Sequence, residues 1–460
     1  MRLVWLYVVE NAFQNKIDGN PTMTNSNAAV TGRSESSVPD FFKLRWMFIA
    51  LIVVGGVINY LDRSTLSIGN TTIAKELSFS TVEMGLLLSA FSWPYAIANL
   101  PAGYLIDRFG VKKMFMFAII SWSLVAVGTS FLSTFAALYV ARMLLGICES
   151  PFFASGLKAS QLWFAKQDRA LPVSVVNTGS QIGNAVAPPF LTFLMLTFSW
   201  RNMFMIVGVL GIGLGIIWWF MYRDPRPAEE RVIKGNEELD AELAADAPVG
   251  SSNANWFSLL KRPNTWFMML GAFGIFYTVW VYLTWLPSYL QTSRGFSLSK
   301  TGWVAALPFL CGICGVVLGG WISSRLVARG WPTIRARKLP IVGGAILAAA
   351  AVLPVAYVED TTLSVLLLCI GYFAAQIPIG CIWTLASDVA ERHLVASLGA
   401  IQNFGGFLGA AVAPIVTGVI LQQTGGSFNL VFVVAGLLLL VGALSYGLFV
   451  RDRRPQTAGA

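Results

Sequence analysis

Long apolar runs separated by short polar loops make up most of the chain. Six such runs precede a polar stretch from Arg223 to Lys261, and six more follow it. Each run is long enough to cross the roughly 30 Å hydrocarbon core of a bilayer as one helix. The pattern predicts an all-α integral membrane protein, with about 12 transmembrane helices in two six-helix bundles. The runs lie at residues 44–70, 83–105, 112–132, 135–157, 171–197 and 203–222, and then at 264–290, 301–324, 339–358, 362–386, 394–422 and 429–450.

The polar segments divide this predicted architecture. Residues 1–40 are rich in Asn, Ser and Thr, a composition that favours disorder. Met23 is an alternative start, in which case residues 1–22 would not belong to the protein. The predicted parts are a disordered cytoplasmic N-terminus at 1–40, an N-terminal bundle at 41–222, a cytoplasmic linker at 223–261, a C-terminal bundle at 262–450 and a cytoplasmic tail at 451–460.

Lysine and arginine are concentrated in alternate loops. The positive-inside rule assigns the Lys- and Arg-rich loops to the cytoplasm. Both termini are on that side, so we predict that both are cytoplasmic. The basic side carries Lys43 and Arg45, Arg108 to Lys113, Lys166 and Arg169, Arg223 to Arg262, Arg325 to Lys338, Arg392, and Arg451 to Arg454, whereas the opposite loops hold Lys75, Arg201, Arg294 and Lys300.

The composition narrows the class of protein further. Hydrophobic residues make up 56% of the chain and charged residues 12%, with a mean hydropathy of +0.66, whereas soluble domains are about 25% charged. The net charge of +9 lies in short loops, so we expect a lipid bilayer and no nucleic acid as partner. The cysteine pair Cys311 and Cys314 lies in an apolar run without a second pair, so we expect no metal or disulfide framework. No nucleophile–base pair or phosphate-binding loop appears, so we do not expect an enzyme.

The two halves of the sequence repeat each other. Glu149 and Pro151 align with Gln376 and Pro378, 227 residues later. Homologous halves of this kind place a binding site near the midplane, which opens alternately to each side as the halves rock. Five further residues repeat at a spacing of 226: Asn177, Gly179, Gly183, Ala187 and Pro188 match Asn403, Gly405, Gly409, Ala413 and Pro414.

Four ionisable residues lie inside predicted membrane helices of the first half. Asp62 and Arg63 are adjacent, and Arg142 and Glu149 are seven residues apart, nearly two helical turns, which puts both on one face. An ionised side chain at the bilayer centre costs a few kcal/mol, so a function is expected. An arginine fork suits a carboxylate, and an acid can carry a proton. The alternative is a static ion network that holds the two helices together.

A loop motif adds a resemblance. Gly103, Asp107 and Arg108, followed by Gly110 and two lysines, resemble the loop signature of the major facilitator superfamily. The resemblance implies two pseudo-symmetric bundles and a latch on the cytoplasmic gate formed by Gly103, Asp107 and Arg108. The alternative is a solvated basic loop, which explains the charges but not the Gly and Asp spacing.

Motifs around the buried charges resemble one branch of that family, the anion:cation symporters. These include proton-coupled galactonate, glucarate and hexuronate transporters, phthalate permeases and the animal sialin. The motifs are Asn-Tyr-Leu-Asp-Arg at 59–63, Ser-Ala-Phe-Ser-Trp-Pro-Tyr at 89–95, and Arg142 with Glu149-Ser-Pro. The resemblance implies that Arg63 binds the substrate carboxylate, that Tyr60, Tyr95, Trp383 and Asn403 contact substrate, that Asp62 and Glu149 take up protons, and that Arg142 tunes Asp62.

The chain departs from the sugar-acid pattern at two places, and at one of them the polar residues just before Trp383 are replaced by Gly380, Cys381 and Ile382. Where galactonate-type members carry Gln, this chain has Ser180, followed by Gln181, and both are kept as candidate contacts. With fewer side chains that can hydrogen-bond to sugar hydroxyls, the sequence is also compatible with an aromatic carboxylate as the substrate.

These observations predict a transporter of the bacterial inner membrane that imports a small organic anion with protons. A sugar acid such as galactonate, glucarate or hexuronate is the first choice. An aromatic carboxylate such as phthalate or hydroxybenzoate is the alternative, and a non-transporting nutrient sensor is a remote one. We expect no cofactor apart from the coupling proton, and a protein that functions as a monomer.

Overall fold

The computed structural model describes residues 38–165, 168, 170–226, 229–233, 257–389 and 395–450. The N-terminal segment before Val38, most of the expected linker and the tail from residue 451 lie outside these ranges. The described residues before Arg45 and those from Arg45 onward belong to separate units, and contacts are described for the second unit. Its described residues contain helices and no β-strand.

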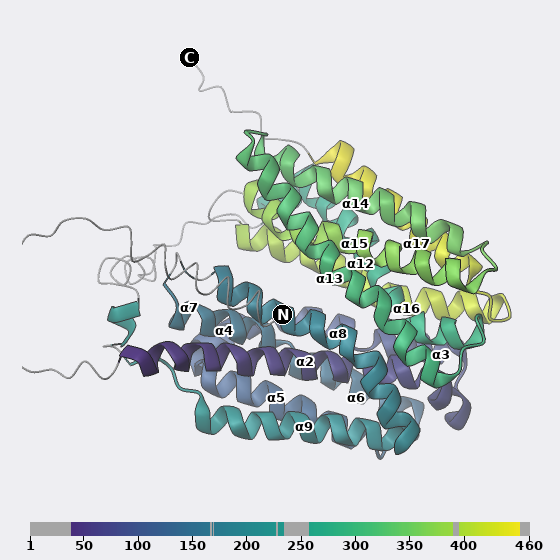
Figure 1. The fold of residues 1–460 in the computed structure, drawn as a ribbon, viewed down its shortest axis with the longest axis horizontal. Coiled ribbons are helices and arrows are strands. Elements are labelled where there is room, and N and C mark those ends of the chain that lie inside the picture. The colour runs from purple at the N-terminus through teal and green to yellow at the C-terminus, as the bar shows by residue number, and fades with distance from the viewer. Residues whose placement is uncertain are drawn as a thin grey trace, which may run out of the picture. The chain divides into compact units, whose positions relative to one another are not determined.

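The first six apolar runs form the helices of the N-terminal bundle. α5 and α9 lie side by side (Figure 1). The helices are α2 (Val38–Leu77), α3 (Thr81–Ser89), α4 (Ser92–Phe109), α5 (Val111–Thr129), α6 (Phe135–Glu149), α7 (Pro151–Trp163), α8 (Ala170–Thr197) and α9 (Trp200–Met221).

The last six runs form the helices of the C-terminal bundle, in which α13 packs against α15 and α12 against α16. A short helix, α11 (Phe257–Leu260), precedes them. The helices are α12 (Pro263–Thr292), α13 (Leu298–Ala328), α14 (Thr333–Val355), α15 (Thr361–Val389), α16 (Val395–Gln423) and α17 (Asn429–Leu444), which ends in a π-helical turn at Ser445–Phe449.

The described residues contain ten helical segments long and apolar enough to cross a membrane, one of them formed by α6 and α7 together and one by α17 with its π-helical turn. The prediction of an all-α membrane protein is therefore confirmed. The other two predicted spans are helical but less regular. The run at 83–105 is divided into α3 and α4, and the run at 171–197 is α8, which carries the polar residues Gln181 and Asn184 and two internal prolines.

Prolines explain the two interrupted helices. Proline has no N–H to donate to the carbonyl four residues earlier. Pro94 therefore leaves Ala90 without its helical donor at the break between α3 and α4. Pro151 does the same to Ile147 between α6 and α7, and the Ser150 hydroxyl donates to that carbonyl at 2.9 Å instead. Both breaks lie beside the charged residues of α2 and α6.

Small and hydroxyl-bearing residues join the two bundles. α3 packs against α16, where the hydroxyls of Ser89 and Thr81 donate to the carbonyls of Ala411 (2.6 Å) and Gly418 (3.1 Å). A side chain at Gly85 would collide with the Pro414 carbonyl. The helix backbones thus meet directly, as small residues allow in membrane proteins.

A second inter-bundle contact joins α2 to α12. The Ser67 hydroxyl donates to the Thr284 carbonyl at 2.9 Å, and the Thr71 hydroxyl donates to the Gln291 side chain at 2.8 Å. The bonds of Thr71 and Thr81 lie near the C-terminal end of α2 and the start of α3, and those of Ser67 and Ser89 lie about two to three helical turns further from that junction. The bundles are therefore tied together in that half of the helices.

Candidate functional site

An ion pair between α2 and α6 lies at the centre of the site. Arg63 Nε donates to Glu149 Oε2 at 2.7 Å, and the two side chains are 12% and 0% exposed. Asn59, one turn before Arg63, is also fully buried. Buried charges persist only when they are paired and hydrogen-bonded. The structure therefore joins the two helices on which the sequence placed buried charges.

Aromatic rings surround the Arg63 guanidinium. Its central carbon lies 5.0 Å from the centre of the Tyr60 ring, 4.6 Å from Phe91 and 4.8 Å from Tyr95. Such cation–π contacts are worth about 2 kcal/mol or more each when desolvated. The break between α3 and α4 presents Phe91, and Gly146 of α6 fits against the Phe91 carbonyl because it has no side chain. Arg63 is thus held on one side by an acid and on the others by rings.

Asp62 and Arg142 are linked through Thr65. Arg142 Nη2 donates to the Thr65 hydroxyl at 3.2 Å, and that hydroxyl donates to the Asp62 carbonyl at 2.6 Å. The Arg142 guanidinium also lies 5.6 Å from the Phe204 ring. The Asp62 side chain is 1% exposed, and its two carboxyl oxygens accept no hydrogen bond from the described residues. Arg142 is therefore near Asp62, with a hydroxyl between them.

Both arginines open onto one cavity between α2, α3, α6, α8 and α12. Its wall includes Trp280 of the C-terminal bundle, a residue that the sequence did not single out. The cavity is lined by Arg63, Arg142, Tyr60, Ser64, Asn184 and Thr284, and by the apolar side chains of Leu66, Leu87, Leu88, Phe91, Trp280 and Leu283.

The other predicted contacts have varied surroundings. Tyr95 is buried beside Arg63 and contacts the Phe407 ring of α16 at 5.0 Å. The Ser180 hydroxyl donates to its own helix, and Gln181 is half-buried. Asn403 is half-buried on α16. Trp383 lies in α15, but its side chain falls outside the described residues. None of Tyr95, Ser180, Gln181 and Asn403 lines the cavity.

Most of the lining residues were not predicted from the sequence, and three of them carry polar atoms on α8 and α12. Asn184, Trp280 and Thr284 are uncharged, so no cost of burying a charge marks them. Asn184 does follow Asn177 and Gln181 at helical spacing on α8, and this stripe of amides is a weak signal that could have identified it.

The predicted latch residues lie at the opposite end of α4 from the inter-bundle contacts. Asp107 pairs with Lys158 of α7 at 3.1 Å, and both side chains are exposed. Arg108 donates weakly to Tyr104 at 3.4 Å. Gly110 follows with φ +82°, a backbone conformation that only glycine adopts at low cost. A side chain at Gly103 would meet no atom within 4 Å.

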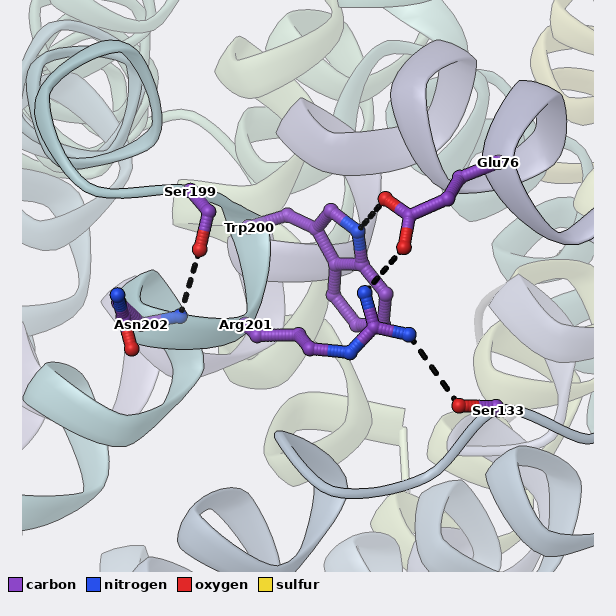
Figure 2. A network of polar contacts seen from close by, with 6 residues as sticks. All are labelled: Glu76, Ser133, Ser199, Trp200, Arg201 and Asn202. Atoms are coloured by element: carbon purple, nitrogen blue, oxygen red, sulfur yellow. Dashed lines mark hydrogen bonds and ion pairs between the residues drawn. The ribbon is translucent and has the colours of Figure 1, made fainter.

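A separate polar network fixes the C-terminal end of α2 (Figure 2). Glu76 accepts from the Trp200 indole at 2.6 Å and forms an ion pair with Arg201. Arg201 also donates to Ser133 at 3.2 Å, in the loop between α5 and α6. This network links α2 to the start of α9 within one bundle.

Comparison with known proteins identifies the family. The family model described as Major Facilitator Superfamily matches residues 52–414, and the chain belongs to this family. A bacterial homologue of the lysosomal transporter Spinster, solved in an inward-facing and occupied conformation, has the same fold, with a TM-score of 0.72 over 89% of this chain and 97% of that one, at 19% identity.

Three individual relatives within the family are named as transporters of particular sugar acids. The chain is 39% identical over 402 residues to a probable L-galactonate transporter of Escherichia coli, covering 87% of this chain and 88% of the relative. It is 33% identical to a probable galactarate/D-glucarate transporter of the same bacterium, covering 89% and 95%. A hexuronate transporter of Bacillus subtilis is 30% identical, covering 91% and 98%. The protein is therefore a multi-pass membrane protein of a transporter family, and these three relatives are named for sugar acids.

Proposed function

We propose that this protein is a secondary active transporter that imports a sugar acid together with protons by alternating access. The observation that carries the proposal is the buried Arg63–Glu149 pair on the wall of a cavity. A guanidinium there is suited to a substrate carboxylate, and the partner acid is suited to a proton. The names of the relatives support a sugar acid as the substrate class.

The ion pair suggests how proton and substrate are coupled. A proton that binds Glu149 Oε2 removes the negative charge that holds Arg63 Nε. The guanidinium is then free to pair with an incoming carboxylate, for which its buried Nη2, which donates to none of the described residues, offers a further donor. An anion that competes for Arg63 leaves Glu149 unpaired in a buried site, where the neutral acid costs less than the ion. Each ligand therefore favours the binding of the other.

Asp62 is the second proposed proton carrier. A buried carboxylate that accepts no hydrogen bond from the described residues is costly when ionised. The Arg142 guanidinium reaches the backbone carbonyl of the same residue through the Thr65 hydroxyl, and its positive charge there would offset part of that cost. The substrate and the protons would thus share one cluster of four ionisable residues.

Alternating access is supported by where the bundles meet. The inter-bundle hydrogen bonds at Ser67, Thr71, Thr81 and Ser89 lie in the half of the helices that is nearer the outside by the positive-inside rule. The exposed Asp107–Lys158 pair lies at the other end. We therefore assign this structure to an inward-facing state, in the bacterial inner membrane with cytoplasmic termini, and expect Asp107 and Arg108 to latch the gate in the outward-facing state.

Reconstitution into liposomes tests the function. Proteoliposomes with an inward proton gradient should accumulate labelled L-galactonate or galactarate above the external concentration. A protonophore should abolish the accumulation, and sodium in place of the proton gradient should not support it. Exchange without net uptake would contradict proton symport, and binding without any transport would instead support a sensor.

An aromatic carboxylate is the second candidate substrate. Phe91 and Trp280 line the cavity with Arg63, and their rings offer a surface for stacking. A thermal-shift screen of purified protein against galactonate, galactarate, hexuronates, phthalate and hydroxybenzoates separates the two classes. Stabilisation by the aromatic acids alone would favour the second candidate.

A further inference from the structure

The cavity wall formed by α8 differs from the one that the sequence suggests. The Ser180 hydroxyl donates to the carbonyl of Asn177 at 2.7 Å, so its proton is used within the helix. Asn184, one helical turn further, lines the cavity together with Arg63. Of the described residues of α8, Asn184 is the one that lines this cavity. A substrate held at Arg63 would therefore meet α8 at Asn184.

The Asn184 side chain is buried without a complete set of partners. It is 6% exposed, and its amide oxygen accepts no hydrogen bond from the described residues. Buried polar atoms in proteins are nearly always paired, because an unpaired one costs about 1–3 kcal/mol. Turning the amide by 180° would exchange its oxygen and nitrogen but would still leave one polar atom unpaired. Because Asn184 lines the cavity, a molecule bound there is in position to supply the missing partner.

We propose that Asn184 determines specificity by hydrogen-bonding to a hydroxyl of a polyhydroxylated carboxylate whose carboxylate is bound at Arg63. The proposal rests on the function proposed above and narrows its substrate class. A side-chain amide presents an acceptor and a donor together, and a hydroxyl group is both donor and acceptor. A buried amide also discriminates against substrates that lack the hydroxyl, because they would leave it unpaired. Asn184 thus favours a sugar acid over an aromatic acid without hydroxyls.

Replacement by leucine provides the sharpest test. Asn184→Leu keeps the approximate shape of the side chain and removes its polar atoms. Because an unpaired buried polar group can be exchanged for an apolar one at little or no cost, the melting temperature without ligand should stay the same or rise. A residue that served only the fold would instead lower it. Asn177→Ala is the matched control, since the Asn177 amide donates to the Val173 carbonyl of its own helix.

The experiment measures the dissociation constants of L-galactonate and of its monodeoxy analogues for the wild type and both variants. Asn184→Leu should weaken L-galactonate binding about tenfold, whereas Asn177→Ala should not change it. For one deoxy analogue, wild type and Asn184→Leu should have the same dissociation constant. The hydroxyl that this analogue lacks is then the one that Asn184 hydrogen-bonds.

Three results would overturn the proposal. Unchanged affinity for L-galactonate in Asn184→Leu would remove Asn184 from recognition and leave the transport function intact. An equal loss for L-galactonate and for every deoxy analogue would show a structural role. A wild-type protein that binds aromatic acids and no sugar acid would overturn this proposal together with the proposed substrate class.

Discussion

The two bundles repeat the same helices but differ in what they bury. The N-terminal bundle buries Asp62, Arg142 and Glu149 and nearly buries Arg63. At the position that repeats Glu149, the C-terminal bundle has Gln376, which is also buried. The side chains there pack against glycines of α13, since a methyl group on Gly315 would lie 3.2 Å from the Gln376 Cβ atom. The N-terminal bundle thus buries ionisable side chains, whereas at the repeated position the C-terminal bundle buries a neutral side chain that packs closely against glycines.

This difference indicates how the protein divides its tasks. Breaking a buried ion pair is costly because it leaves an uncompensated charge. Arg63 and Glu149 belong to the same bundle, so a rigid-body rotation of one bundle against the other leaves the pair together. Only a proton or an anion then changes it. The C-terminal bundle contributes uncharged groups to the cavity, of which Trp280 and Thr284 are described.

Glu149→Gln tests the charged bundle with the largest expected effect. The variant cannot bind a proton at this position, so accumulation driven by a proton gradient should be lost completely. Exchange of labelled for unlabelled substrate should persist, because Arg63 remains available. Both rates are measured in the same proteoliposome preparation, with Gln376→Ala as a control at the repeated position. Normal accumulation by Glu149→Gln would exclude a proton-carrying role for Glu149.

Arg63→Lys should have the next largest effect. A lysine keeps the positive charge but not the planar fork that pairs with both oxygens of a carboxylate. Loss of one charge-assisted hydrogen bond costs about 1.5–3 kcal/mol, so we expect binding to weaken at least tenfold. Calorimetric titration of the purified variant with L-galactonate measures this. If the affinity did not change, the anion would have to bind elsewhere, with Arg142 as the next candidate.

Part of this site followed from the sequence alone because buried charges are conspicuous. Asp62, Arg63, Arg142 and Glu149 stood out in apolar runs, and helical periodicity put the last two on one face, as the structure shows. The partners within the cluster did not follow, because they depend on how α2 and α6 are rotated and spaced. The resemblance associated Arg142 with Asp62, and Arg142 does reach the Asp62 backbone carbonyl through Thr65, but the direct ion pair of Arg63 with Glu149 was not predicted.

The cavity wall could not be predicted for a related reason. Asn184 and Trp280 are ordinary residues of membrane helices, and their position on the wall depends on how the two bundles meet. Phe91 contacts Arg63 because the helix breaks before Pro94. This break could not be predicted from the proline alone, since proline is also common in the first turn of uninterrupted helices. The twelve apolar runs, by contrast, depend on local composition, and they fall on the observed helices.

Gln376→Glu asks whether the C-terminal bundle tolerates the charge that the N-terminal bundle carries. Its surroundings are the glycine-packed contact between α13 and α15, and the described neighbours supply no arginine of the kind that Glu149 has. An unpaired charge in a membrane helix costs about 2.5–3.5 kcal/mol, so the melting temperature should fall at pH 7 and recover partly in acid. Gln376→Leu is the uncharged control and should fall much less. Equal melting temperatures for Gln376→Glu and wild type would show that the two bundles are equivalent in this respect.

Tyr372→Phe should have the smallest effect. The Tyr372 ring packs against Phe309 and Tyr282, with ring centres 5.0 and 5.1 Å apart, and its buried hydroxyl has no hydrogen bond of good geometry to the described residues. Removing an unpaired buried hydroxyl while keeping the ring is nearly neutral or stabilising. Stability should therefore change by less than about 1 kcal/mol, and the dissociation constant of L-galactonate by less than about threefold. A larger loss of affinity with unchanged stability would show that this hydroxyl contacts substrate, and would give the neutral bundle a direct part in recognition.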